Sequence, residues 1–360
     1  MDINFVLDTI VLQPTSFCNI DCLYCYLPDR HKNMRMNPVV TQKISESISD
    51  YNKDITLLWH GGEPLACGIK HFSLLIEPFK KLKNTGILDH TIQTNGTLIN
   101  ENWCEFFISH NFNVGISIDG PIWANKNRID KKGQETYARI IKGIQYLKDN
   151  NINFTVIAVV SKESLTRAKE IYEFFCMLKC SSVGFNIEEK ENVNKREICD
   201  NNMVTNFWSD LFDFWKANPV IEVREFSQIL SRIELLSTEE DKEPVNLQYS
   251  IYPSITYNGD IVLLSPEFLG AKAPQYDDFI VGNINNESLL SIINRMNNIS
   301  YVDDYVNGIK KCAMDCEYFS FCGGGWASNK FFELGSINTT ETVFCRNYKQ
   351  RPLEAVVNQL

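Results

Sequence analysis

The sequence contains no apolar run long enough to cross a bilayer, and this absence argues against a protein built on transmembrane helices. The apolar opening from Phe5 to Leu12 is short, contains Asp8 and has no basic leader before it. This pattern is typical of a strand and not of a signal peptide. We therefore expect a cytoplasmic protein with no membrane partner.

Positive charge is also scarce, because 35 Lys and Arg residues stand against 45 Asp and Glu residues, for a formal net charge of -10. Proteins that bind nucleic acid carry basic patches, so we expect no nucleic-acid partner. The chain has 360 residues, of which 44% are hydrophobic and 12% aromatic. That length and composition predict a large core, enough for a barrel and a smaller module.

Cysteine, in contrast, is plentiful, with twelve residues in a chain without an export signal. Cytosolic thiols are kept reduced, so these cysteines favour metal ligation over disulfides. Cys18, Cys22 and Cys25 are separated by three and two residues. Three thiolates in one loop hold three irons of a cubane cluster and leave the fourth open, whereas a purely structural cluster ordinarily takes four. The spacing predicts a catalytic iron-sulfur centre.

A glycine turn follows the next apolar segment. The run from Ile55 to Trp59 is typical of a buried strand, and His60-Gly61-Gly62-Glu63-Pro64 comes directly after it. Glycines let the backbone approach a ligand closely. The Glu63 carboxylate can accept charge-assisted hydrogen bonds from an ammonium group. The turn is therefore a candidate ligand-binding segment.

The rest of the first half alternates strands and amphipathic helices, which predicts an α/β fold with a parallel sheet. Helical spacing of apolar residues begins at Tyr137 and again after Ser161, and Asn37-Pro38 is a typical helix start. The expected strands are Val6 to Gln13, Ile55 to Trp59, His90 to Thr94, Asn113 to Ile118, Phe154 to Val160 and Val183 to Ile187.

Beyond the barrel the pattern changes twice. We expect a barrel over residues 1–190, a helical bridge and linker over 191–247, and a second module over 248–360. The bridge should bury an aromatic stripe as core, and the charged segment from Thr238 to Pro244 is a predicted linker or exposed loop. Asn258-Gly259 predicts a hairpin from Ile255 to Ser265. The stripe consists of Phe207, Trp208, Leu211, Phe212 and Trp215.

Taken in order, the cysteine loop with Tyr24, the Gly61 to Pro64 turn and two further runs resemble the radical S-adenosylmethionine (radical SAM) enzymes over about the first two-thirds of the chain. The further runs are Gln93 to Leu98 and Gly115 to Pro121. The resemblance implies a partial (β/α)6 barrel with the motifs at the C-terminal ends of its strands. It also implies S-adenosylmethionine on the open iron of a catalytic 4Fe-4S cluster, as the source of a 5′-deoxyadenosyl radical.

The same resemblance implies roles for single residues. Tyr24 would pack near the adenine, and Gly61, Gly62 and Glu63 would bind the methionyl ammonium. Ser117 and Arg128 would hold the ribose and the carboxylate. Arg128 has a simpler interpretation as a solvated arginine in the polar segment 125–132. Ser117 and the neighbouring Asp119 have one as an ordinary strand end and turn.

Four more thiols, which stand in the last fifty residues, are enough to close a second cluster without an open iron. A structural zinc site is the alternative. We favour a cluster, because the barrel already requires iron-sulfur assembly. The region resembles the C-terminal SPASM module of peptide-modifying radical enzymes, which binds two auxiliary clusters. Trp326 stands where another cysteine is expected, and the upstream hairpin offers Ser265, so we expect a reduced module with one auxiliary 4Fe-4S cluster. The four cysteines are Cys312, Cys316, Cys322 and Cys345.

Two shorter stretches, Leu264 to Gly270 and Cys322 to Phe332 with its continuation to Cys345, resemble the cyclophane-forming peptide maturases. These enzymes join an aromatic ring carbon to the β-carbon of a nearby residue in a ribosomally made precursor peptide. The resemblance implies that peptide as substrate and an external electron donor such as flavodoxin or ferredoxin. Glu267 is the candidate base for the ring proton, with a hydrogen-bonded loop carboxylate as the alternative. The auxiliary cluster would accept the electron or be structural.

Other functions remain open from the sequence. They are a thioether bridge, an epimerised residue with Cys67 as hydrogen donor, a sulfatase-maturase-like oxidation and a non-catalytic electron carrier. The chain begins directly with a barrel strand, so we expect peptide recognition by the bridge, the hairpin or a separate protein, for example by strand addition. The ungrouped cysteines are expected to be core residues. They are Cys67, Cys104, Cys176, Cys180 and Cys199.

Overall fold

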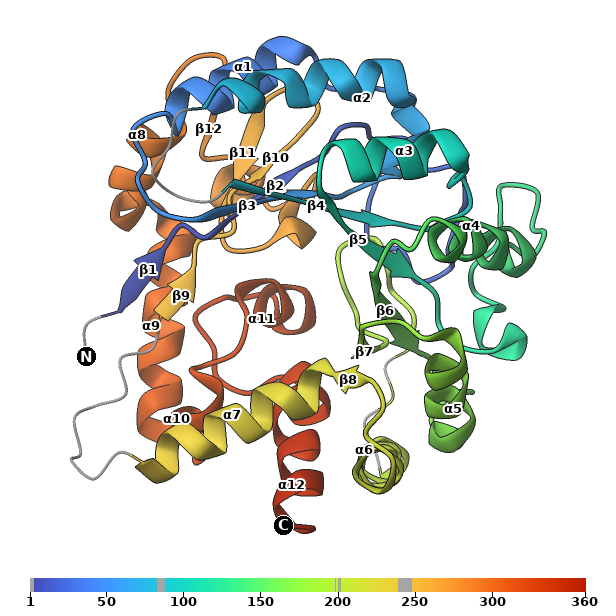
Figure 1. The fold of residues 1–360 in the computed structure, drawn as a ribbon. Coiled ribbons are helices and arrows are strands. Elements are labelled where there is room, and N and C mark those ends of the chain that lie inside the picture. Colours follow the sequence, from blue (N-terminus) through green and yellow to red (C-terminus); the bar gives the residue numbers. More distant parts are fainter. Residues whose placement is uncertain (1–2, 83–87, 198, 200–201, 239–247) are drawn as a thin grey trace.

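The computed structural model describes residues 3–82, 88–197, 199, 202–238 and 248–360. Its main feature is a ten-stranded sheet in the order β12-β11-β10-β2-β3-β4-β5-β6-β7-β8 (Figure 1). The six strands from β2 to β7 are parallel, which confirms the predicted α/β class and the six barrel units. They are β2 (Thr9–Leu12), β3 (Ile55–Trp59), β4 (Leu88–Thr94), β5 (Phe112–Ser117), β6 (Phe154–Val160) and β7 (Ser182–Ile187).

Short strands extend the sheet at both edges. At one edge, β8 (Glu222–Val223) runs parallel to β7. At the other, β10 (Ser254–Ile255) runs parallel to β2, followed by antiparallel β11 (Asp260–Val262) and β12 (Gly282–Asn283). The predicted hairpin is therefore present, and it continues the sheet of the barrel.

The first expected strand is divided. β1 (Asn4–Val6) pairs with β9 (Gln248–Ser250) in a separate two-stranded sheet, whereas β2 pairs with β3 and β10. A single straight strand is unable to pair in both sheets, so the chain turns between Val6 and Thr9. The apolar pattern alone gave no sign of this change of partner.

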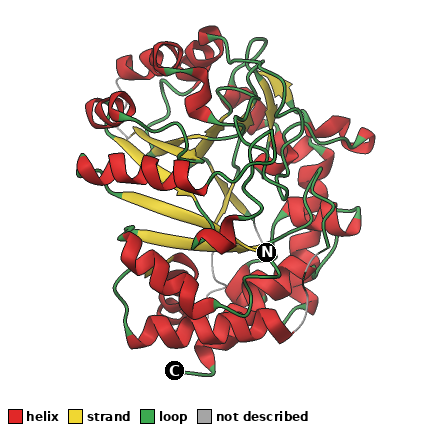
Figure 2. Cartoon of the chain, turned by 90° about the vertical axis from the view of Figure 1, so that its right-hand side faces the viewer, coloured by secondary structure: helices red, strands yellow, loops and turns green. Residues whose placement is uncertain are grey.

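Helices cover the outer side of the sheet, and strands lie inside the helical layer (Figure 2). The first helix begins as predicted, because Asn37 Oδ1 accepts a 3.0 Å hydrogen bond from Val39 N and Pro38 occupies the first turn. The helices of the barrel are α1 (Pro38–Ser47), α2 (Ile69–Ile76), α3 (Glu101–Ser109), α4 (Tyr137–Asp149) and α5 (Ala168–Leu178).

Aromatic side chains fill the space between the strands and these helices. Trp59 and Phe72 are fully buried with ring centroids 4.8 Å apart, and the Trp59 indole donates to His90 Nδ1 at 3.0 Å. Phe72 packs edge-on against Trp103 of α3 at 5.8 Å. Such aromatic pairs stabilise a core beyond the area that they bury. The packing fixes the end of β3, from which the glycine turn leaves.

The bridge consists of two helices, α6 (Asn202–Ala217) and α7 (Arg224–Thr238). Its aromatic stripe packs in the core, as predicted, with Trp215 partly buried. Phe212 packs edge-on against Phe226 of α7 at 5.0 Å, and the Trp208 indole donates to the Asn347 carbonyl at 2.7 Å. After its first residue, the predicted linker Thr238 to Pro244 lies outside the described residues.

The C-terminal region is helical and approaches the inner side of the sheet, where α11 lies in Figure 1. None of the helices in the described ranges is both long and apolar enough to cross a membrane. The C-terminal helices are α8 (Leu289–Asn294), α9 (Ser300–Asp315), α10 (Phe319–Cys322), α11 (Ala327–Leu334) and α12 (Arg351–Val357).

Candidate active site

Cys18, Cys22 and Cys25 lie in the loop that leaves the C-terminal end of β2. Backbone hydrogen bonds fix this loop: Cys18 N donates to Arg30 O at 2.9 Å, and Leu23 N donates to Asn127 O at 3.0 Å. The three thiols are partly buried and free. The loop therefore presents its sulfurs beside the segment that follows β5.

Hydrogen-bond donors and a buried guanidinium group surround these thiols. Burial raises the pKa of Cys22 to about 12, against the lowering effect of Arg128, and Cys25 raises it further. Asn95 Nδ2 lies 3.8 Å from Cys18 Sγ, and Arg128 Nη1 lies 3.9 Å from Cys22 Sγ. Iron binding requires thiolates, so cluster uptake releases protons. Three neighbouring sulfurs that face N–H donors fit an iron-sulfur cluster.

The glycine turn packs against the backbone of the cysteine loop. Gly61 and Gly62 have φ values of 87° and 65°. A Cβ atom on Gly62 would lie 2.5 Å from Thr15 O and 2.7 Å from Phe17 O, closer than any real contact. Glu63 N donates to Phe17 O at 2.8 Å. Only glycine permits this approach at Gly62, so the turn and the loop hold one another in place.

The Glu63 carboxylate ties the turn to the end of β4. It accepts from Thr94 Oγ1 at 2.6 Å, from Asn95 N at 2.8 Å and from Leu65 N at 3.0 Å. Burial raises its pKa to about 6, and the three hydrogen bonds act in the opposite direction. Because the protein already provides three donors, the backbone carbonyls of the turn are further candidates for an ammonium contact.

A buried ion pair stands at the end of β5. Arg128 Nη2 lies 2.8 Å from Asp119 Oδ1, and their side chains expose only 6% and 1% of their surface. Tyr24 Oη donates to Asp119 Oδ2 at 2.6 Å, and the Tyr24 ring centroid lies 5.5 Å from the guanidinium carbon of Arg128. The interpretation of Arg128 as a solvated arginine is therefore wrong. Asp119, which the sequence suggested only as part of a turn, joins the cysteine loop to the barrel.

One atom of this group is left for a ligand. Arg128 Nε is buried and has no hydrogen-bond partner among the described residues. Unsatisfied buried donors are rare in native structures. Ser117, at the end of β5, accepts from Gln93 Nε2 at 2.8 Å and remains partly exposed. A ligand that carries both a carboxylate and ribose hydroxyls, such as S-adenosylmethionine, fits this pair of donors.

The four C-terminal cysteines lie on different elements. Cys312 is in the last turns of α9, Cys316 caps that helix, Cys322 ends α10, and Cys345 begins a π-helical segment (Cys345–Gln350). Burial raises the pKa of Cys322, and the neighbouring Cys345 and Cys316 raise it further. A shared electrostatic environment links these thiols, although they come from distant parts of the sequence.

Hydrogen-bond donors surround these sulfurs. Gly324 N and Thr342 Oγ1 donate to Cys322 Sγ and Cys345 Sγ, each at 3.4 Å. In the described ranges, no three His, Cys, Asp or Glu side chains are gathered tightly enough for one metal ion. A zinc site needs its sulfurs about 2.3 Å from a single point. Hydrogen bonds from N–H and O–H groups to the sulfurs are of the kind that support cluster thiolates.

Three carboxylates lie between the two groups of cysteines. Glu189 and Glu191 follow β7, and Glu267 lies in a short 3-10 helix (Pro266–Phe268). Burial raises the pKa of all three, and Glu267 raises those of Glu189 and Glu191 further. Burial, then Glu267, Glu191 and Cys25 raise the pKa of Tyr26 beside the cysteine loop. The sequence suggested only Glu267, because Glu189 and Glu191 belong to no recognisable motif.

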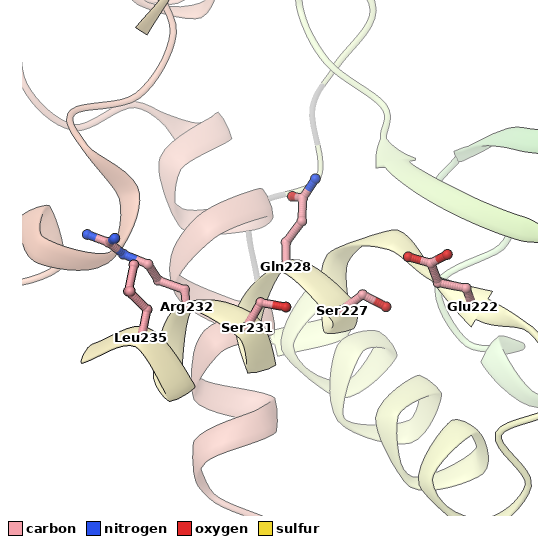
Figure 3. A pocket seen from close by; sticks show the side chains of 6 residues that line it. All are labelled: Glu222, Ser227, Gln228, Ser231, Arg232 and Leu235. Carbon is pink, nitrogen blue, oxygen red and sulfur yellow. The ribbon is translucent and has the colours of Figure 1, made fainter. Parts of the chain in front are cut away.

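The positions predicted to lack a second auxiliary cluster carry other contacts. Trp326 is 43% exposed and rests on Phe344, with ring centroids 5.9 Å apart. Ser265 is buried and donates to the Glu267 carboxylate. A separate surface pocket, lined by residues of β8 and α7, contains no predicted site residue (Figure 3).

Comparison with known proteins assigns the class. Residues 12–175 match the model of the radical SAM superfamily. The chain belongs to this superfamily, as predicted, and is an enzyme that uses S-adenosylmethionine and a 4Fe-4S cluster.

Among individual proteins, the uncharacterized protein sll1766 of Synechocystis is 37% identical over 370 residues, which are 98% of this chain and 91% of that protein. A serine-type anaerobic sulfatase-maturating enzyme of Bacteroides thetaiotaomicron is 24% identical over 95% of this chain and 87% of its own length.

Solved structures show the same fold. The structure of anSMEcpe with AdoMet and the Cp18Cys peptide has a TM-score of 0.81 at 23% identity, with 98% of both chains covered. Streptococcus suis SuiB bound to its precursor peptide SuiA has a TM-score of 0.64 at 18% identity and covers 94% of this chain and 75% of that one.

Proposed function

We propose that this enzyme is a peptide maturase that forms a carbon-carbon cross-link, a cyclophane, between an aromatic ring and the β-carbon of a nearby residue in a ribosomally made precursor peptide. The observation that carries the proposal is the carboxylate group Glu189, Glu191 and Glu267, placed beside the catalytic cysteine loop. Cyclophane formation requires a base at that place, because the ring must lose a proton.

A peptide substrate agrees with the structural neighbours, since anSMEcpe was solved with the Cp18Cys peptide and SuiB with the precursor peptide SuiA. In this chain, we assign cluster binding to Cys18, Cys22 and Cys25. Tyr24, Gly61, Gly62, Glu63, Ser117 and Arg128 hold S-adenosylmethionine. When bound, these cofactors supply a 5′-deoxyadenosyl radical that removes a hydrogen atom from the β-carbon.

Glu267 is the proposed base. Its pKa is raised by burial, while the hydroxyl of Ser265 counteracts that shift. Burial raises the pKa values of Glu189 and Glu191 well above the ordinary value, and the like charge of Glu267 raises both further. The two neighbours therefore keep their protons, and Glu267 ionises first and receives the ring proton.

Ring closure also releases one electron. One auxiliary 4Fe-4S cluster would be held by Cys312, Cys316, Cys322 and Cys345. Such a cluster can accept one electron. The electron for cleavage of S-adenosylmethionine comes from an external donor such as flavodoxin or ferredoxin. Twelve cysteines that form no disulfide within the described residues are consistent with a cytoplasmic location, where such donors occur.

The bounds 1–190 for the barrel, 191–247 for the bridge and 248–360 for the cluster module are part of the proposal. Two alternatives have specific observations against them. An epimerase with Cys67 as hydrogen donor is disfavoured because Cys67 is 2% exposed and its thiol donates to Pro64 O at 3.0 Å. A sulfatase-maturase-like oxidation is the second alternative, which the names of several relatives suggest. Trp326 and Ser265 argue against it, because they occupy positions where a full module has cysteines.

Coexpression with the short peptide encoded beside the gene, followed by mass spectrometry, tests the proposal. The expected product has lost two hydrogens in a segment that contains an aromatic residue and no cysteine. Cys18→Ala should leave the peptide unchanged. An unchanged peptide with the wild-type enzyme contradicts the cyclophane assignment.

Isotope labelling separates the alternatives. With a β-deuterated substrate residue, deuterium should appear in 5′-deoxyadenosine, whereas an epimerase would take the α-deuterium. A thioether maker would require a substrate cysteine. Glu267→Gln should still form 5′-deoxyadenosine but little cross-link. Glu173→Gln, at an exposed position on α5, is the matched control.

A further inference from the structure

Lys330 is a lysine whose side chain is completely buried. It lies in α11 and is 0% exposed. Among the described residues, no carboxylate forms an ion pair with its ammonium group. Lysine is almost never fully buried without a partner, so its surroundings must provide negative charge in another form.

The nearest partners of the ammonium group are sulfur and an aromatic ring. Lys330 Nζ lies 3.6 Å from Cys312 Sγ and 5.9 Å from the ring centroid of Tyr305. A Cβ atom on Gly308 would lie 3.1 Å from Nζ and 2.7 Å from Ile337 O. Glycine at this position of α9 leaves the space that the ammonium group occupies.

Electrostatics agrees with this geometry. The ammonium group is buried, and its nearest anionic partner is a cysteine sulfur. A buried charge is stable only when it is paired and hydrogen-bonded. The thiolates of a bound cluster are the partners that the described residues offer.

We propose that Lys330 is a positioning residue that raises the reduction potential of an iron-sulfur cluster held by Cys312, Cys316, Cys322 and Cys345. The inference rests on the proposed auxiliary cluster. The couple is the one-electron reduction of the cluster, which adds one negative charge. A fixed positive charge at low dielectric stabilises the reduced form more than the oxidised form, and net charge and hydrogen bonds to sulfur are known determinants of cluster potential.

The residue before Lys330 in α11 contacts the proposed base group. The preceding residue, Asn329, donates from Nδ2 to the Glu189 carboxylate. One helix therefore contacts both the proposed base group and the proposed electron acceptor, through neighbouring residues. A cluster tuned to accept an electron at this point suits a reaction in which a proton and an electron leave the same ring.

A redox titration followed by electron paramagnetic resonance tests the proposal. The full chain with Cys18, Cys22 and Cys25 replaced by alanine isolates the auxiliary cluster. In this background, Lys330→Met should lower the ratio of reduced to oxidised cluster about tenfold at a fixed potential, about 59 mV for a one-electron couple. Lys330→Arg should retain most of the potential. Lys310→Met, an exposed charge change on α9, should leave it unchanged.

Iron and sulfide content separates the two proposals. Absence of a cluster in the triple alanine background overturns the auxiliary cluster itself. A cluster whose potential is equal in the Lys330→Met and Lys330→Arg proteins, or shifts equally in Lys310→Met, overturns the role of Lys330. If Lys330→Met takes up no iron, Lys330→Gln is measured in its place. Loss of iron in both neutral variants would show that Lys330 is needed for cluster assembly, and would overturn its role in setting the reduction potential.

Discussion

The two cysteine groups of this enzyme each face a buried cation, but the cations are balanced differently. Arg128 beside Cys22 is paired with Asp119, so that group carries its own counter-charge. Lys330 beside Cys312 has sulfur as its near anionic partner. The barrel site is electrostatically complete without iron, whereas the C-terminal site depends on the thiolates. Under the proposed assignment, this difference in charge balance separates the cluster with an open iron from the cluster that only protein thiolates hold.

Removal of a barrel cysteine should produce the largest difference between the two groups. Cys18→Ala should reduce 5′-deoxyadenosine formation to background, because an open-iron cluster has no spare thiolate. Bound iron should fall to roughly half, since the C-terminal cysteines are untouched. Iron analysis and chromatography of the nucleoside measure both effects. Cys104→Ala, at a buried position outside both groups, should leave iron unchanged.

Removing the carboxylate charge that pairs with Arg128 should have the next largest effect, on the stability of the fold. Asp119→Asn leaves a buried guanidinium without its carboxylate, and we expect a loss of about 3 kcal/mol or more in unfolding free energy. Denaturant unfolding of the iron-free protein measures it. Asp130→Asn removes a carboxylate from the more exposed pair with Arg139 and should change stability little. Similar losses in both variants would contradict the comparison.

The close approach of turn and cysteine loop can be tested with two glycines. Gly62→Ala combines a positive φ with a clash against two backbone carbonyls, so we expect about 2–3 kcal/mol of destabilisation. Gly335→Ala also changes a residue with a positive φ, in the left-handed helical region, but meets nothing within 4 Å, and should cost about 1 kcal/mol. Thermal unfolding of the iron-free proteins gives both values. Equal losses would mean that the positive φ alone sets the loss of stability and that the contact with the cysteine loop contributes nothing.

The pH dependence of product partition should be the smallest effect. The raised pKa of Glu267 means that it is protonated above the ordinary range of a carboxyl group. The ratio of cross-link to 5′-deoxyadenosine should therefore rise with pH until Glu267 is ionised, and then level off. Product analysis across pH measures the ratio. A ratio that falls over this range would exclude Glu267 as the base.

Much of this molecule could be predicted from the sequence, because its pattern is local. Strands such as β3 and β6 match their expected limits, since apolar runs between turn signals leave little choice. The division of the first strand was not visible, because it depends on pairing with residues near 250. Local pattern carries no information about such distant partners.

The site shows the same division. Motif residues could be named from the sequence, but Asp119, Glu189 and Lys330 gain their significance only from neighbours brought together by folding. Asp119 resembled a turn residue, and Lys330 resembled any helical lysine. Their surroundings result from packing between separate segments, which spacing alone does not encode: Asp119 contacts the cysteine loop, Glu189 contacts α11, and Lys330 contacts α9.

The pairing of β10 with β2 also bears on the order of events during synthesis. β2 leads directly into the first cysteine loop, yet its outer neighbour is made only when the ribosome reaches residues 254–255. Until then the outer edge of β2 has no strand to bind, and proteins on the ribosome fold as each unit becomes available. The three thiols of the first cysteine loop therefore stand beside a sheet edge that is completed only after residues 254–255 have been made.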